Sequence, residues 1–324
     1  MKLSGNFPNF TKNSESLIKA ILDLGTNTFN LLIAEIKGNQ LEQIFKTQEA
    51  VKLGEGGINQ GKIMPAPFER GVNAVKKLKE RAGEFKAEEI IAIATSAIRS
   101  ASNGDDFIQR VKEQTGVTIQ KIDGNAEAAY IFEGVKNSVP MDNQNILVMD
   151  IGGGSVEFII GNQNGIRWKQ SFNIGAARLI DKFHRKDPIG KDEISDLKNH
   201  LLNTLGPLLE AVEKYPVNKM VGSAGSFESI IDLILELLHK KLMDESQSYC
   251  RIPLEYFHQI YQIIIASTEQ ERKNMKSIPG FRVEMMVVSA ILMDFVLENL
   301  KIKELFCTTY ALREGILFSK LKMD

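Results

Sequence analysis

Two copies of one short pattern, set far apart, constrain this chain more than any other feature. Residues 23–28 read DLGTNT and residues 150–155 read DIGGGS, so both run aspartate, aliphatic residue, glycine, two further residues, then serine or threonine. Their first residues, Asp23 and Asp150, lie 127 positions apart. Such a pattern can arise once by chance, whereas its presence at the head of each half indicates duplicated domains that face each other.

The segments around the two copies are also alike. Apolar runs precede and follow each copy, at residues 20–22 and 29–34 in the first half and at residues 146–150 and 156–160 in the second. Short apolar runs joined by Gly, Asn and Thr are typical of two strands and a tight turn. Each half is therefore predicted to begin with a strand, a turn and a second strand.

The remaining periodicity predicts an α/β protein. We expect further strands at residues 41–51, 89–95, 117–122, 166–174, 219–222 and 304–308, and helices at residues 68–85, 105–115, 125–135, 191–214, 227–242, 254–266, 283–299 and 312–321. The apolar run 285–293 is too short to span a membrane and is followed by Asp294, so we interpret it as part of a buried helix.

Composition excludes several classes of protein. Hydrophobic residues make up 43% of the chain and charged residues 25%, which excludes a disordered, collagen-like or coiled-coil chain. The 40 Lys and Arg against 41 Asp and Glu give a net charge of −1, which argues against a protein that coats DNA. The two cysteines lack metal-binding spacing and the polar residues 1–16 lack a signal segment, so we expect a cytoplasmic protein without DNA or membrane partners.

The two turns have the chemistry of a phosphate site. A tight turn exposes successive backbone N–H groups, and a concave row of such donors binds anions. Glycines 152–154 allow close approach of the backbone, and hydroxyls at residues 26, 28 and 155 add donors. Asp23 and Asp150 lie beside these turns, and a carboxylate repels phosphate unless a cation intervenes. This predicts Mg²⁺ held by the two aspartates.

Six segments, taken in order, narrow the interpretation: residues 21–29, 94–99 (ATSAIR), 122–130, 150–161, 222–226 and 311–315 (ALREG). The two turns resemble those of the actin-like superfamily of sugar kinases, acetate kinases, heat-shock chaperones and actin. All six together resemble the exopolyphosphatase and guanosine pentaphosphate phosphohydrolase (Ppx/GppA) phosphatase family. The resemblance runs over residues 17–321 and is to the short, two-domain form.

The resemblance implies a fold and a reaction. The fold would be α/β, with two actin-like (ribonuclease H-like) domains of mixed sheets flanked by helices and an active site in the cleft between them. Domain I would span residues 17–135, after a tail at 1–16, domain II residues 136–310, and a last helix at 311–324 would pack back on domain I. The reaction would be Mg²⁺-dependent hydrolysis of the terminal phosphate of polyphosphate, or of the 5′-γ-phosphate of guanosine pentaphosphate, a nucleotide of the stringent response.

The resemblance also assigns roles to residues. Glu127 matches the catalytic glutamate that would deprotonate the attacking water. Arg99 matches an arginine that faces the cleft, and as a second catalytic residue it would stabilise charge on the phosphate oxygens. Asp23 and Asp150 match the two acidic positions assigned here to the metal. The phosphate-binding residues would be Thr26, Asn27, Thr28, Gly152, Gly153, Gly154, Ser155 and Glu157, and the turn that holds adenosine in kinase relatives matches Gly222, Ser223, Ala224 and Gly225.

Alternatives stay open at this point. Spacing alone favours an exposed helix-start residue for Glu127 and a surface salt bridge for Arg99. A kinase-like phosphotransferase or a non-catalytic polyphosphate or alarmone sensor could use the same scaffold. The segments 123–126 and 280–284 depart from the family pattern, which leaves the choice between polyphosphate and guanosine pentaphosphate open. Chain-length preference, the metal, the extent of domain closure and a homodimer are also left open.

Overall fold

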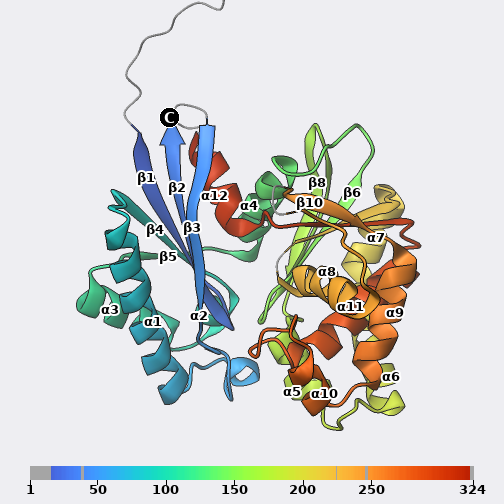
Figure 1. Ribbon diagram of the computed structural model, residues 1–324. Helices are drawn as coiled ribbons and strands as arrows, with labels where there is room; N and C mark the ends of the chain where they lie inside the picture. The colour runs from blue at the N-terminus through green and yellow to red at the C-terminus, as the bar shows by residue number, and fades with distance from the viewer. Residues whose placement is uncertain (1–15, 38–39, 224, 245–246, 322–324) are drawn as a thin grey trace, which may run out of the picture.

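Two β-sheets, set side by side with helices around and between them, organise the chain (Figure 1). The computed structural model describes residues 16–37, 40–223, 225–244 and 247–321. Three predicted features lie partly outside these residues. They are the tail at 1–16, the end of the C-terminal helix at 311–324, and the nucleotide turn, of which Ala224 is not described. The predicted α/β class with two mixed sheets flanked by helices is confirmed.

The first sheet has the strand order β3-β2-β1-β4-β5. The three strands β1, β2 and β3 are antiparallel, whereas β4 is parallel to β1 and β5 is parallel to β4. The bounds of these strands are β1 Leu17–Leu24, β2 Thr28–Lys37, β3 Gln40–Ala50, β4 Glu89–Ala94 and β5 Ile119–Lys121. The first copy of the repeated pattern is therefore the β1–β2 hairpin, as predicted.

Two helices cover the outer face of this sheet, α1 (Pro65–Glu84) and α3 (Gly104–Thr115). Side chains along a strand alternate between its two faces. Leu22 and Leu24 of β1 therefore point to the same side, where they are buried with Val75 of α1 and Phe107 of α3. Ile21, which precedes Leu22, belongs to a separate core on the inner face.

The second sheet has the order β10-β11-β9-β6-β7-β8. Strands β11, β9 and β6 are parallel to one another, and the remaining pairs are antiparallel. The bounds are β6 Ile146–Ile151, β7 Val156–Asn162, β8 Gly165–Phe172, β9 Lys219–Ser223, β10 Tyr249–Ile252 and β11 Glu304–Thr308. The second copy of the pattern is the β6–β7 hairpin, in the corresponding place.

Most helices of the second half cover the outer face of the second sheet, and α11 (Met285–Asn299) is central among them. All its residues from Met286 to Leu297 are buried, so the predicted buried helix is confirmed. The others are α5 Ala176–Phe183, α6 Lys191–Thr204, α7 Gly206–Lys214, α8 Gly225–Leu238, α9 Leu254–Ala266 and α10 Glu269–Asn274. In the described part of the chain, no helix combines the length and the apolar character that crossing a bilayer requires.

The inner faces of both sheets pack on a pair of helices, α4 (Gly124–Lys136) and α12 (Leu312–Leu321) (Figure 1). One core joins Ile21 of the first sheet and Val148 of the second to Ile131 of α4 and Ile316 of α12. The two helices touch through glycine, since a Cβ added at Gly134 of α4 would lie 2.5 Å from a backbone carbonyl oxygen next to α12. The predicted domain boundary near residue 136 stays a prediction.

The structure differs from the sequence analysis in several local elements. The predicted helix at 191–214 is two helices, α6 and α7, because Pro207 lacks the N–H that a continuous helix needs. The predicted helix at 227–242 ends at Leu238, and His239 takes a left-handed φ of 56°. Short elements were missed: the 3-10 turn η1 (Ile58–Gln60), helices α2 (Ser96–Ser100), α5 and α10, and strand β10.

Candidate active site

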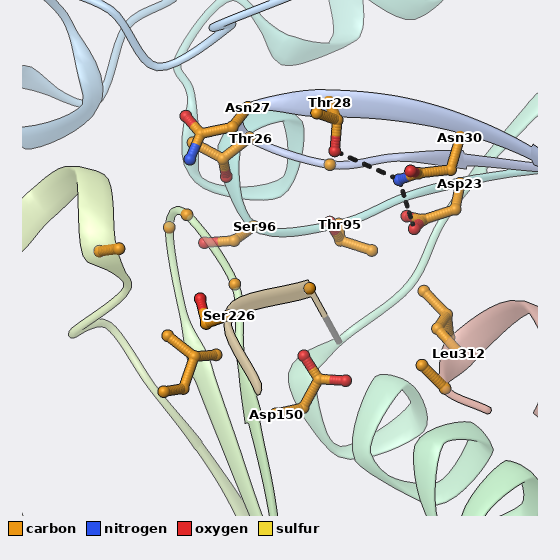
Figure 2. A pocket seen from close by; sticks show the side chains of 18 of the residues that line it. Asp23, Thr26, Asn27, Thr28, Asn30, Thr95, Ser96, Asp150, Ser226 and Leu312 are labelled. Carbon is orange, nitrogen blue, oxygen red and sulfur yellow. Dashed lines mark hydrogen bonds between the residues drawn. The ribbon is translucent and has the colours of Figure 1, made fainter. Parts of the chain in front are cut away.

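A cavity of about 170 Å³ lies between the two hairpin turns (Figure 2). Of the residues assigned from the sequence, those that line it are Asp23, Thr26, Asn27, Thr28, Glu127, Asp150, Gly152, Gly153, Gly154, Ser155, Glu157 and Gly225. Arg99, Gly222 and Ser223 do not line it. The structure thus brings together both turns, both aspartates and Glu127, which come from β1, α4, β6 and the loops after β1 and β6.

The first turn, between β1 and β2, is held by its carbonyl groups. The Gly25 amide donates to the Thr28 carbonyl at 3.1 Å and closes the turn. The Thr26 carbonyl accepts from the Gly54 amide at 3.2 Å, and the Asn27 carbonyl accepts from the Val51 amide at 2.8 Å. In a trans peptide the next N–H points the opposite way from the carbonyl, so the amides that follow point away from the loop at 51–54.

The second turn, between β6 and β7, is held in the same way but by a helix. The Gly152 and Gly153 carbonyls accept from the amides of Ala176 and Ala177 at the start of α5, at 3.0 and 2.8 Å. With its carbonyls turned toward α5, the turn directs the following N–H groups to the other side. Such a row of amide donors is suited to an anion, as the sequence analysis expected.

Glycine is required where the two turns approach each other. A Cβ added at Gly154 would lie 2.6 Å from Thr26 Oγ1 and 2.6 Å from Ser96 Oγ. Figure 2 shows the Thr26 and Ser96 side chains at this place, on the wall formed by the first half. Ser96 Oγ is buried and has no hydrogen-bond partner among the residues the structure describes.

Two aspartates line opposite walls of the cavity, Asp150 buried and Asp23 half-buried (Figure 2). Burial raises the pKa of Asp23 to about 6, against the opposing effects of Arg313 and of a hydrogen bond from Asn30 Nδ2 at 3.2 Å. Burial, aided by the charge of Glu157, raises the pKa of Asp150 to about 7, although the Ser223 hydroxyl donates to its Oδ2 at 2.5 Å. Both carboxylates are therefore costly to keep ionised without a positive charge nearby.

Glu127 lies in the first turn of α4, where it forms a buried ion pair. Asp123 caps this helix by accepting from the Ala126 amide at 2.8 Å, and Glu127 is the residue after Ala126. Arg99 Nη1 donates to Glu127 Oε2 at 2.7 Å. Burial and the neighbouring charge of Glu157 nevertheless raise the pKa of Glu127 well above its usual value.

Arg99 and Glu157 are both turned toward other protein groups. Arg99 lies beside Glu127 and also donates to the Ile122 carbonyl at 3.2 Å, and it does not line the cavity. Glu157 Oε1 accepts from the Ser171 hydroxyl at 2.6 Å, and burial raises the pKa of its carboxyl. In this arrangement Arg99 holds the Glu127 carboxylate, which the sequence analysis did not foresee.

Several residues that were not predicted from the sequence also line the cavity. Three are cations, Lys46 of β3, Arg282 before α11 and Arg313 at the start of α12. Arg313 belongs to the ALREG segment and Arg282 to the segment at 280–284, so motifs already singled out contained both. Lys46 had no such signal, because only the pairing of β3 with β2 brings it to the site.

The predicted nucleotide turn is partly filled by protein. A Cβ added at Gly225 would overlap the guanidinium of Arg282, which therefore packs directly on this glycine. Arg282 Nη1 also donates to Ser229 Oγ at 3.3 Å. A Cβ added at Gly222 would likewise overlap the ring of Phe227. The space above Gly225 is occupied by an arginine side chain in this structure.

The fold has two mixed sheets, and a hairpin turn and an aspartate from each sheet line one cavity between them. This arrangement is that of the actin-like class of folds. Comparison with known proteins narrows this class. The chain belongs to the Ppx/GppA phosphatase family, whose sequence profile its residues 32–324 match. The resemblance stated from the sequence is therefore confirmed, and so is the fold class.

Solved structures agree with this assignment. An exopolyphosphatase from Cytophaga hutchinsonii is 37% identical, with a TM-score of 0.92 over 94% of this chain and 98% of that chain. A PPX-GPPA enzyme from Aquifex aeolicus is 26% identical, with a TM-score of 0.76 over 94% of this chain and 99% of that one.

A curated relative is a bifunctional 3-dehydroquinate synthase/phosphatase from Fusobacterium nucleatum, 42% identical over 181 residues, which are 53% of this chain. The matched part is 27% of that relative, so the chain spans about a quarter of the length of the larger protein.

Proposed function

We propose that this protein is a phosphohydrolase that releases the terminal phosphate of inorganic polyphosphate or the 5′-γ-phosphate of guanosine pentaphosphate. The observation that carries the proposal is the cavity itself, where two amide-lined turns face each other with Glu127 in the wall. Membership of the Ppx/GppA phosphatase family supports hydrolysis, and the Cytophaga relative is named as an exopolyphosphatase.

Water would attack the terminal phosphorus atom while the bond to the bridging oxygen breaks. In this proposal Glu127 accepts the proton from the water, and the shortened chain leaves with the bridging oxygen. Burial raises the pKa of Glu127, which makes its carboxylate a stronger base than an exposed one. Arg99, which donates to Glu127 Oε2, would hold the carboxylate in place instead of contacting phosphate. The turn amides would stabilise charge on the phosphate oxygens.

The donor set fits Mg²⁺. Asp150 is buried and Asp23 is half-buried, and burial raises the pKa of both carboxyl groups. Mg²⁺ prefers one or two carboxylates together with water and phosphate oxygens. No group of three or more His, Cys, Asp or Glu side chains in the described part of the chain could hold a metal ion. We propose that Asp23 and Asp150 hold Mg²⁺, which when bound would neutralise charge on the phosphate.

Polyphosphate is the substrate we favour. A nucleoside held at the turn of residues 222–225 would compete for space with Arg282, which packs on Gly225. The same contact disfavours an ATP-dependent kinase, which would need that turn for adenosine. A pure sensor would not need Glu127 in the cavity. The cytoplasmic location and a homodimer stay predictions.

The test is phosphate release by the purified protein with Mg²⁺, comparing long-chain polyphosphate with guanosine pentaphosphate. Glu127→Gln should lower the rate by about 10²–10⁴-fold, the usual contribution of a general base. Glu113→Gln is the matched control, because Glu113 is exposed on α3 and does not line the cavity. Wild-type protein that releases no phosphate from either substrate would refute the proposed function.

A further inference from the structure

One arginine outside the cavity connects the second turn to the other half of the molecule. Arg178 lies on α5, and its Nε donates to the Gly154 carbonyl at 2.8 Å. Its Nη1 donates to the Ile58 carbonyl at 2.7 Å, and its Nη2 donates to the Ser100 hydroxyl at 3.1 Å. One guanidinium therefore contacts the turn of the second half and two segments, η1 and α2, of the first.

Each of the three glycine carbonyls of the second turn accepts a hydrogen bond from α5, and the contact of Arg178 with Gly154 is the third of these. The carbonyls of the turn accept, in order, from the Ala176 amide, the Ala177 amide and Arg178 Nε. Three consecutive residues of α5 thus fix the direction of the three glycine carbonyls, and through the planar peptides they fix the N–H groups that follow. Gly175 makes this possible, since a Cβ there would overlap the turn backbone.

On the first half, Arg178 reaches the helix that carries other site residues. Ser100 ends α2, and its hydroxyl donates in turn to the carbonyl of Ser96, whose own hydroxyl lines the cavity. Arg99, which holds Glu127, precedes Ser100 in the same helix. Arg178 therefore contacts the second turn, which forms one wall of the cavity, and α2, which carries Ser96 of the other wall.

We propose that Arg178 is a positioning residue that sets the second phosphate turn in place only when the two halves are closed on each other. This inference rests on the proposed function, because it concerns how the same cavity binds phosphate. When the halves separate, the bonds to Ile58 and Ser100 break. The guanidinium then keeps only its bond to the Gly154 carbonyl, and the donor to that carbonyl is no longer held in one direction. Closure and the geometry of the turn are thereby linked.

The shape of the guanidinium is essential to this role. Arginine offers N–H donors in a rigid planar fork, so three acceptors in different directions can be held at once. Lysine carries the same charge on a single, freely rotating ammonium group. The conservative change Arg178→Lys therefore separates geometry from charge.

The experiment measures inhibition of wild-type and variant enzyme by inorganic phosphate, together with kcat and KM for polyphosphate. Arg178→Ala and Arg178→Lys should both weaken phosphate binding about tenfold or more, the effect of losing a charged hydrogen bond. Lys182→Ala removes one exposed positive charge from the same helix and should change phosphate binding little. Recovery of wild-type phosphate binding in Arg178→Lys would overturn the proposal, because charge alone would then suffice.

A second comparison tests the link to closure. Asp181 Oδ2 accepts from Asn59 Nδ2 at 2.6 Å, so this bond also joins the two halves. Asp181→Ala removes it and keeps the contacts of Asn59 with Arg178, so phosphate binding should stay near wild type. Ser100→Ala, which keeps Arg178 and its bond to Gly154, should weaken phosphate binding by an intermediate factor. Equal effects of Asp181→Ala and Arg178→Ala would refute a specific role for Arg178.

Two readouts do not depend on catalysis. Small-angle scattering should give a larger radius of gyration for Arg178→Ala than for wild type, and calorimetry can measure inorganic phosphate binding directly. If wild type hydrolyses neither substrate, the proposed function fails while these measurements still test Arg178. If wild type is active and the Arg178 variants match it in phosphate binding and radius, only the role of Arg178 fails.

Discussion

Replacing Gly134 with alanine should change the stability of the protein in two opposite ways, through helix propensity and through a steric clash of the new Cβ. Gly134 lies in the last turn of α4, and alanine is a better helix former than glycine by about 0.5–1 kcal/mol. Against this gain, the new Cβ would lie 2.5 Å from the carbonyl oxygen of Ala311, where ordinary contacts begin at 3.4 Å. The two backbones must therefore separate by about 0.9 Å, the difference between these distances.

The obstacle at Gly134 is backbone, so no side chain can rotate away. Over-packing a close-packed interior costs about 1–3 kcal/mol, and the upper end applies here because two helices must move. After the gain in helix propensity, we expect the free energy of unfolding to fall by about 2 kcal/mol. Phosphate release should fall too, because α4 carries Glu127 and α12 carries Arg313, and both line the cavity.

The assay is urea unfolding followed by circular dichroism, which gives the free energy of unfolding from the midpoint and slope. Gly83→Ala is the matched control: Gly83 lies in the last turn of α1, and a Cβ there would meet nothing within 4 Å. That variant should be more stable than wild type by about 0.5–1 kcal/mol. A Gly134→Ala protein as stable as Gly83→Ala would refute the close contact of α4 with the start of α12.

Three further predictions follow from single sites. Gly154→Ala should fold normally but raise KM at least tenfold, because its Cβ would lie 2.6 Å from two hydroxyls inside the cavity; an unchanged KM would place phosphate elsewhere. Burial raises the pKa of Cys250 to about 11 and that of Cys307 well above its usual range, so thiol reagents at pH 8 should label neither before urea unfolds the chain. Arg272→Ala should lower the free energy of unfolding by about 3 kcal/mol, measured by urea titration, because the buried Val283 carbonyl loses its donor along with an ion pair; a change below 1 kcal/mol would contradict this.

Much of the fold could be predicted because its signals are local. The β1–β2 and β6–β7 hairpins follow from apolar runs joined by glycine-containing turns, and α11 follows from an apolar run long enough only for a buried helix. The short elements α2, α5, α10 and β10 were missed because so few residues give no clear period. The break between α6 and α7 was missed although Pro207 marks it.

The candidate site was predictable in part for the same reason. Asp23 and Asp150 belong to the repeated pattern, and the structure places both in one cavity. Their roles in binding metal and phosphate stay predictions. No sequence pattern joined Arg99 to Glu127, which are 28 residues apart, or Arg178 to Ser100, which are 78 apart.

The sequence by itself determined the two strand–turn–strand units, the family and the kinds of side chain beside each turn. Those features depend on neighbours within a few residues, whose conformations follow from steric limits and burial of one face. Only the tertiary structure decided that Arg282 packs on Gly225, that Lys46 reaches the cavity and that one guanidinium ties the second turn to the first half. Such contacts depend on how α4 and α12 space the two sheets, and that spacing is set by the packing of the whole chain.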